Sequence, residues 1–149
     1  MDHSKKAVRL FKSGYNCSQA VLGAYAEELG LDLDTALKIS SSFGGGMGRM
    51  REVCGALTGA FMVIGMLNGG YDAKDNKSKS ELYTSIQELA DEFKQQNGSI
   101  ICRELLGLSQ KGADSPVPEL RTDGYYKKRP CVELVELVAK NLDEKYFSD

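Results

Sequence analysis

The spacing of the apolar residues is the feature that most constrains the fold of this chain. In its long segments apolar residues recur at intervals of three and four, and no segment alternates apolar and polar residues as a half-buried strand would. A helix with this period buries one stripe against its neighbours. The pattern therefore predicts an all-α fold. A length of 149 residues suits a single-domain helical bundle over residues 1–149 that buries its core without disulfides.

Capping and turn residues divide this pattern into about six or seven helices. We expect them at about residues 4–13, 16–29, 32–40, 51–67, 79–96, 99–108 and 130–147. Asn16, with Gln19 three residues later, is a capping-box signal for the start of the second helix. The stretch 107–129 contains glycine and proline without a helical period, so we expect a long loop there with a covering or functional role.

The helix expected at 51–67 is apolar on every side. Because a helix of that kind is buried all round, we expect it at the centre of the bundle. Its apolar run of about fifteen residues is shorter than the roughly twenty that are needed to cross a bilayer. We therefore expect no membrane insertion.

Charge and the first residues of the chain narrow the partners and the compartment. The chain has 19 basic and 21 acidic residues, a formal net charge of −2, and no long block of one sign, so nucleic acid is not an expected partner. Arg9 and Lys12 interrupt the apolar residues near the N-terminus, which does not fit a secretory signal. We therefore expect a cytoplasmic protein with reduced thiols. His3, the only histidine, lies in a terminal segment that we expect to fray.

The cysteines carry the strongest chemical signal in the chain. All four fall within the first turn of an expected helix: Cys17, Cys54, Cys102 and Cys131. The free N–H groups and the dipole at a helix start favour the thiolate, and so do the arginines and lysines near three of these cysteines. Alternate helices of an up-and-down bundle begin at the same end. We therefore expect the four thiols to gather at one pole of the bundle.

A glycine-rich stretch, GGGMGRMREVCGALTG, surrounds Cys54. It lacks the Lys-Ser/Thr pair of a P-loop and the last glycine of a dinucleotide-binding loop, so phosphate binding is not expected. Gly55 and Gly59 instead form a small-xxx-small face that permits close helix packing. The helix start, two nearby arginines and the adjacent glycine make Cys54 the predicted nucleophile. The residues expected to contact a bound group are Arg51, Gly55 and Gly59.

The run CGALTG at 54–59, with one cysteine upstream in GYNCSQAV and two downstream, resembles the redox-active proteins named for their C_GCAxxG_C_C cysteine pattern. The resemblance extends from the first cysteine to the fourth, and it implies that the family cysteines are Cys17, Cys54, Cys102 and Cys131. That family in turn resembles part of the split-Soret cytochromes, which implies electron transfer or an iron-sulfur centre. The chain has no C-x-x-C-H, so covalently attached haem is not expected.

Three functions remain open for the four cysteines. In the first, they are catalytic thiols that exchange disulfides with an unidentified redox partner, one cysteine attacking and a second resolving the mixed disulfide. In the second, all four are ligands of a metal such as zinc or of an iron-sulfur cluster, although their spacing of about thirty to fifty residues matches no close-pair motif. In the third, the chain is a structural helical protein that forms a homo-oligomer, with the 51–67 helix contributing to a homodimer.

Overall fold

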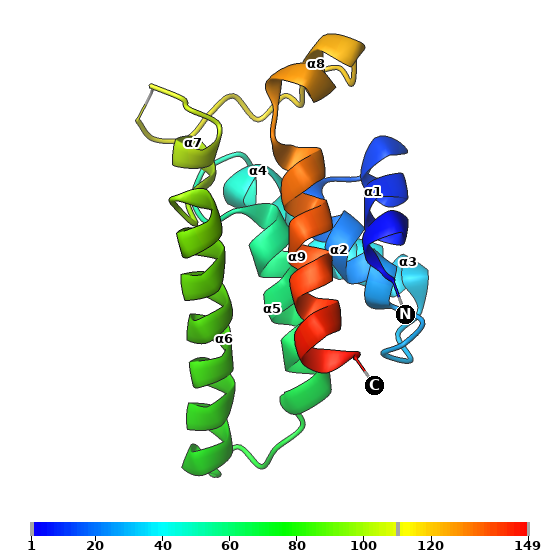
Figure 1. Cartoon of the computed structure of the whole chain (residues 1–149), viewed down its shortest axis with the longest axis vertical. Helices are drawn as coiled ribbons and strands as arrows, with labels where there is room; N and C mark the ends of the chain where they lie inside the picture. The colour runs from blue at the N-terminus through cyan, green and yellow to red at the C-terminus, as the bar shows by residue number, and fades with distance from the viewer. Residues whose placement is uncertain (1, 110, 149) are drawn as a thin grey trace.

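The structure is a computed structural model that describes residues 2–109 and 111–148 (Figure 1). The α-helices in those ranges are α1 (Ser4–Lys12), α2 (Cys17–Tyr25), α3 (Leu33–Ser40), α4 (Gly44–Met47), α5 (Gly55–Asn68), α6 (Asn76–Asn97), α7 (Cys102–Leu105), α8 (Asp123–Lys128) and α9 (Cys131–Tyr146). A short 3-10 helix, Ser41–Phe43, precedes α4. No strand occurs in the described ranges, and one isolated antiparallel bridge joins Val53 and Ile101. The predicted all-α class is confirmed.

The short helices α4 and α8 lie outside the helices that the sequence predicts. α8 begins after Thr122, whose hydroxyl oxygen accepts a hydrogen bond from the backbone N–H of Tyr125. A helix of 6 residues is too short to show a hydrophobic period. The described residues of the stretch expected to be loop, 107–109 and 111–129, are therefore irregular up to Thr122 and helical over most of the residues before α9.

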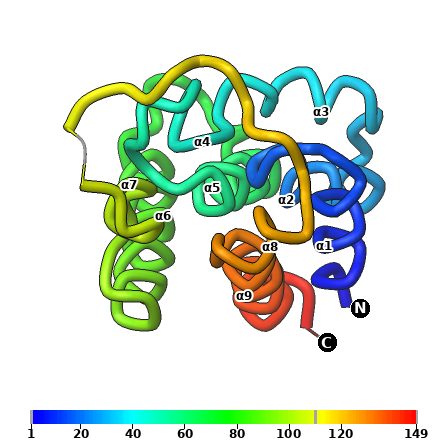
Figure 2. Tube along the Cα trace, turned by 90° about the horizontal axis from the view of Figure 1, so that it is seen from above, coloured from blue at the N-terminus to red at the C-terminus, as the bar shows by residue number. Residues whose placement is uncertain are grey.

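α5 runs through the middle of the molecule, with α6 on one side and α2 and α9 on the other (Figure 1, Figure 2). Its first two turns are buried all round, as the apolar pattern predicts, from Gly55 to Ala60. The last turn is open to solvent, since Met66 and Leu67 are 49% and 40% exposed. In the ranges that the structure describes, a helix with the length and hydropathy of a bilayer span is absent.

Two glycines set the close approach of α5 to α2. A Cβ atom added to Gly59 would lie 2.8 Å from the carbonyl oxygen of Ser18 and 3.0 Å from the Cβ of Val21. A Cβ added to Gly55 would lie 3.3 Å from the Cβ of Cys17. The small-xxx-small pair thus lets the two helix backbones approach closely at a point where a larger side chain would push them apart. As a result the first residue of α2 lies beside the first turn of α5.

Asn16 fixes the start of α2. Its side-chain oxygen accepts a hydrogen bond from the N–H of Gln19 at 2.9 Å, and the side-chain oxygen of Gln19 accepts one from the N–H of Asn16 at 3.1 Å. This reciprocal pair is the capping box that the sequence predicts. It places Cys17 at the first helical position, where backbone N–H groups have no partner within the helix.

His3 is not in a frayed terminus, and that expectation was wrong. The side chain is 3% exposed, stacks on Tyr25 with ring centroids 4.2 Å apart, and places Nδ1 2.6 Å from a carboxylate oxygen of Asp143. The hydroxyl of Tyr25 donates to the same carboxylate at 2.9 Å. Contacts with residues far along the chain hold this segment, and local sequence does not reveal them.

Candidate functional site

The four cysteines begin four different helices. Cys54 is the N-cap residue of α5, and the other three are the first residues of their helices, Cys17 of α2, Cys102 of α7 and Cys131 of α9. The starts of α5, α7 and α9 lie at one end of the molecule, the upper end in Figure 1. The chain from α7 to α8 runs across that end when it is seen from above (Figure 2).

All four cysteines line one cavity of about 230 Å3. Glycines and arginines of the stretch before α5 form part of its wall: Gly44, Gly45, Gly46, Arg49 and Arg51. The segment after α7 contributes another part: Glu119, Arg121, Tyr125 and Arg129. The cavity is therefore bounded by groups from both halves of the chain, and its sulfur atoms come from helices that are remote in sequence.

A hydrogen bond links the thiols of Cys17 and Cys131. The bond lowers the pKa of Cys131, which accepts it as a thiolate, and the positive charges of Arg129, Arg121 and Arg51 lower that pKa further against the opposing effect of burial. The same bond, together with burial, raises the pKa of Cys17 well above its ordinary value. At neutral pH the pair thus consists of a thiol that donates a proton and a neighbour that is the more readily ionised.

Cys102 faces a buried arginine. Its Sγ accepts a hydrogen bond from Nη1 of Arg51 at 3.5 Å. Burial raises the pKa of Cys102, and the hydrogen bond and charge of Arg51 oppose that rise. For the guanidinium, burial would lower the pKa, but hydrogen bonds to Cys102 and Asp114 outweigh it and raise the pKa of Arg51. Arg51, one of the residues expected to contact a bound group, thus lines the cavity with its charge directed at a thiol.

Cys54, the nucleophile that the sequence predicts, lies in a different environment from the one expected. Its side chain is 5% exposed, and burial raises its pKa to about 12 although the backbone N–H groups of Ala56 and Leu57 pull the other way. The thiolate form of Cys54 is therefore scarce at neutral pH. Cys131 differs from Cys54, because a helix start and nearby cations are combined there with a hydrogen bond from a neighbouring thiol.

The backbone before α5 folds back on itself through a run of left-handed residues. Gly45, Gly46 and Gly48 have φ values of 68°, 68° and 60°, and Arg51 adopts 61° despite its side chain. A Cβ on Gly46 would lie 2.7 Å from the Cβ of Cys102, which no real Cβ tolerates. The glycines therefore allow the start of α7 to approach this turn closely.

The bridge between Val53 and Ile101 completes that approach. The N–H of Cys54 donates to the carbonyl of Ile100 at 2.8 Å, and the N–H of Cys102 donates to the carbonyl of Glu52 at 2.6 Å. Backbone hydrogen bonds of this kind fix the relative positions of the starts of α5 and α7. The two buried thiols are thus held by main chain rather than by side-chain packing alone.

A loop between α7 and α8 is tied to the glycine-rich stretch by ion pairs. Arg51 donates from Nε and Nη2 to one carboxylate oxygen of Asp114 at 3.2 and 3.0 Å, and Arg49 donates to that oxygen at 3.2 Å. Glu119 pairs with Arg129 and lies 3.9 Å from Arg49. Sequence reasoning did not identify Asp114, Glu119 or Arg121, which fall in the long stretch without a helical period. The unusual length of that stretch was the available signal.

Gly55 and Gly59 differ in their relation to the cavity. Gly55 lines it beside Cys17, whereas Gly59 lies one turn further along α5 against Ser18 and Val21. Gly59 contributes to the packing of α5 on α2, and its predicted contact with a bound group stays a prediction. Gly55 serves both the packing and the shape of the cavity.

Four thiols are suitable donors for zinc or an iron-sulfur cluster, so the fit of such a group can be tested on their arrangement. Within residues 2–109 and 111–148, no three His, Cys, Asp or Glu side chains converge as metal ligands. All four cysteines are free thiols; Cys17 is hydrogen-bonded to Cys131, and Cys102 to Arg51. The positions of the thiols among the described residues therefore do not fit a bound metal ion.

Comparison with known proteins gives one match. The family model described as "Putative redox-active protein (C_GCAxxG_C_C)" covers residues 15–145, a range that includes all four cysteines. No curated protein matches the chain, and no solved structure does.

Proposed function

Because this chain belongs to the C_GCAxxG_C_C family of redox-active proteins, we propose that it transfers electrons through a reversible disulfide between Cys17 and Cys131. The observation that carries the proposal is the hydrogen bond between these two thiols at the edge of a cavity. Two free thiols that interact directly are neighbours between which a disulfide can form.

The two cysteines have different roles in this exchange. The Cys131 thiolate attacks one sulfur of a partner disulfide, a new bond forms to that sulfur, and the other sulfur leaves as a thiolate that takes up a proton. Cys17 then loses its proton to solvent and attacks Sγ of Cys131, which releases the second partner thiol and leaves the Cys17–Cys131 disulfide. Two electrons have moved from the protein to the partner, and the reverse sequence returns them.

The assignment of roles follows from the environments of the two sulfurs. Cys131 is the attacking group because its pKa is lowered by Cys17 and by the nearby arginines, and the thiolate is the nucleophilic form. Cys17 is the resolving group because its pKa is raised, so it stays protonated until the mixed disulfide has formed. Cys54 and Cys102 are buried in the same cavity, and this exchange does not require either of them.

Disulfide mapping tests the proposal. Reduced protein is oxidised in a series of thiol/disulfide buffers, quenched with an alkylating agent and digested, and the cross-linked peptides are identified by mass spectrometry. We expect a Cys17–Cys131 peptide in the wild type and in the C54S and C102S variants, and none in C17S or C131S. A disulfide confined to Cys54 and Cys102, or the loss of no thiols at any buffer potential, contradicts the proposal.

A further inference from the structure

We infer that the cavity binds a small disulfide that carries a carboxylate, and that Arg121 is the residue that binds the carboxylate. The inference rests on the proposed function and adds the chemical class of its substrate. Three observations carry it: the charge of the cavity lining, the bonding of Arg121, and the size of the cavity.

The ionic groups of the lining are mostly cations. The charged residues of the described lining are Arg49, Arg51, Glu119, Arg121 and Arg129. Two carboxylates pair with these arginines, since Asp114 accepts from Arg49 and Arg51, and Glu119 from Arg129. Four guanidinium charges against two carboxylates leave an excess of two positive charges. The Cys131 thiolate, when it forms, would balance one of them, and an anionic ligand would balance the other.

Arg121 is the arginine of this lining that has no carboxylate within ion-pair distance among the described residues. Its two Nη atoms donate to the backbone carbonyl oxygens of Phe11 at 2.8 Å and Tyr15 at 2.9 Å. Its guanidinium carbon lies 4.4 Å from the ring centroid of Phe11 and 5.1 Å from that of Tyr125. A guanidinium has five N–H donors, so these bonds leave three for a ligand.

The position of Arg121 is set before any ligand arrives. The two carbonyls and two aromatic faces hold the guanidinium in place, so little side-chain freedom is lost when a carboxylate binds. A planar guanidinium also matches the two oxygens of a carboxylate. Its charge acts on Cys131 as well, because Arg121 contributes to the lowered pKa of that thiol. One ligand can thus place its carboxylate at Arg121 and its sulfur at Cys131.

The size of the cavity favours a small molecule over a peptide. Its volume of about 230 Å3 is below the roughly 300–1,000 Å3 of sites that enclose drug-sized ligands. A disulfide with short carboxylate-bearing substituents, RS–SR, is of suitable size. Its reaction is RS–SR plus the two protein thiols giving two RSH and the Cys17–Cys131 disulfide, and the reverse reaction oxidises the small thiol.

The first experiment uses the unmodified protein and three symmetric disulfides of similar length. These probes are 3,3′-dithiodipropionate with two negative charges, bis(2-hydroxyethyl) disulfide with none, and cystamine with two positive charges. The rate of oxidation of the reduced protein by each probe is divided by the rate of 2-mercaptoethanol with the same probe, which removes intrinsic reactivity. We expect this normalised rate to be about tenfold higher for the dianion than for the neutral probe, and lowest for the dication.

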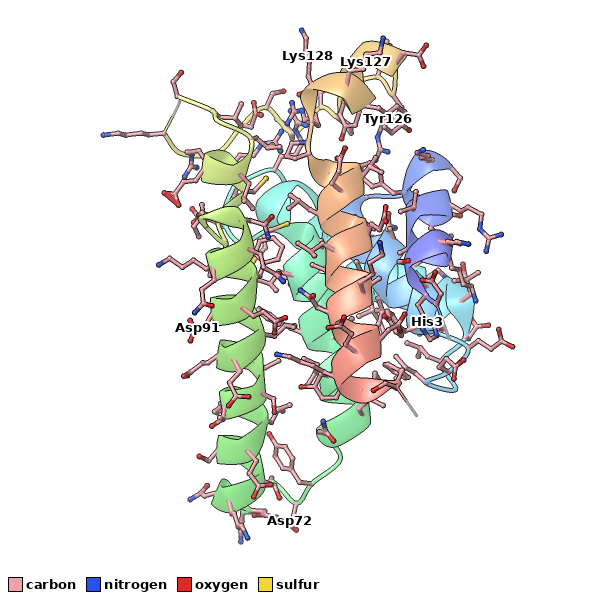
Figure 3. The ribbon with its side chains drawn as sticks, in the orientation of Figure 1. His3, Asp72, Asp91, Tyr126, Lys127 and Lys128 are labelled. Carbon is pink, nitrogen blue, oxygen red and sulfur yellow. The ribbon has the colours of Figure 1, made fainter. Side chains whose placement is uncertain are left out.

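The second experiment assigns that preference to Arg121. We expect Arg121→Gln to reduce the dianion-to-neutral ratio by about tenfold and Arg121→Lys to retain part of it. The ratio is the readout because Arg121 also affects the reactivity of Cys131 toward every probe. Lys127→Gln is the matched control, since Lys127 extends from α8 away from the bundle (Figure 3) and the variant carries the same change in net charge. We expect its ratio to equal that of the wild type.

The outcomes separate this inference from the proposed function. If the Cys17–Cys131 disulfide forms with all three probes at equal normalised rates, or if Arg121→Gln leaves the ratio unchanged, the inference is overturned and the proposed function stands. If no probe produces that disulfide, the proposed function itself fails. Should Arg121→Gln unfold the protein, the wild-type charge series alone still decides, because equal rates for the three probes contradict the inference without any variant.

Discussion

Nη1 of Arg51 lies 3.5 Å from Sγ of Cys102, and Nε and Nη2 of the same side chain bind one carboxylate oxygen of Asp114. One buried guanidinium therefore connects a thiol of the cavity to the loop that runs across it. The connection links the stability of the loop to the electrostatics of the cysteines.

Replacing Arg51 tests that connection. Arg51→Gln removes the charge between Cys102 and Asp114, so the buried thiol and the carboxylate, which is 21% exposed, each lose a partner. We expect the free energy of unfolding to fall by about 1–3 kcal/mol, measured by denaturant titration with an unchanged slope. Arg49→Gln is the control, because its side chain is 17% exposed against 4% for Arg51. A loss as large in the Arg49 variant would contradict the role assigned to burial.

The alkylation rate of Cys131 should rise with pH as its thiol ionises. Because the Cys17 hydrogen bond and the arginines lower the pKa of Cys131, alkylation at that residue should reach half its maximal rate at a lower pH than for an ordinary cysteine. Cys17→Ala removes the donor, so the midpoint should move to higher pH. Peptide-resolved alkylation across a pH series measures both values. An unchanged midpoint in Cys17→Ala, with Cys54→Ala as the reference variant, argues against the thiol pair.

Cys54 should be the least reactive thiol in the native protein. With a pKa of about 12 and a nearly inaccessible side chain, it stays protonated at pH 8, and we expect alkylation there only after unfolding. The raised pKa of Cys54 also makes the stability of the fold depend on pH. The unfolded thiol ionises near ~8.5 and the folded one does not, so stability falls as pH rises from that value toward 12. Cys54→Ala should remove this component, and labelling of Cys54 ahead of Cys131 would contradict the assignment.

Replacing each of two glycines of α5 by alanine should change the stability in opposite directions. Gly59→Ala places a Cβ 2.8 Å from a backbone oxygen of α2, so we expect a loss of about 1–3 kcal/mol in unfolding free energy. Gly65 lies in the same helix, and a Cβ added there would meet no atom of the surrounding described residues within 4 Å. We therefore expect Gly65→Ala to raise the unfolding free energy by about 0.5–1 kcal/mol through helix propensity. Thermal or denaturant unfolding of both variants measures the difference. Equal effects would show that the crossing of α2 and α5 can relax.

The sequence predicts the features that depend on neighbours in the chain. Asn16 and Gln19 lie three residues apart, so the cap of α2 can be inferred from local spacing, and it is confirmed. The helical starts at the four cysteines likewise follow from capping and periodicity. The all-α class follows because long helices repeat the same pattern many times.

Other features depend on residues that only folding brings together. Burial raises the pKa of Cys54, whereas the hydrogen bond from Cys17 and the charges of nearby arginines lower the pKa of Cys131, so two similar helix starts hold thiols that ionise differently. His3 is paired with Asp143, and Arg51 with Asp114, although each pair is far apart in the sequence and no local pattern predicts it. The left-handed backbone at Arg51 could not be predicted from the residue type, because that conformation is typical of glycine and not of arginine.

The proposed disulfide between Cys17 and Cys131, at the starts of α2 and α9, would couple oxidation to folding. A bond between them would close a loop of most of the chain, which in the chain-entropy model favours the folded state by about 4–5 kcal/mol. By linkage, the folded protein would hold that bond more strongly than the unfolded chain, by on the order of 100 mV in reduction potential. Reductants in the surroundings would then govern heat resistance as well as redox state.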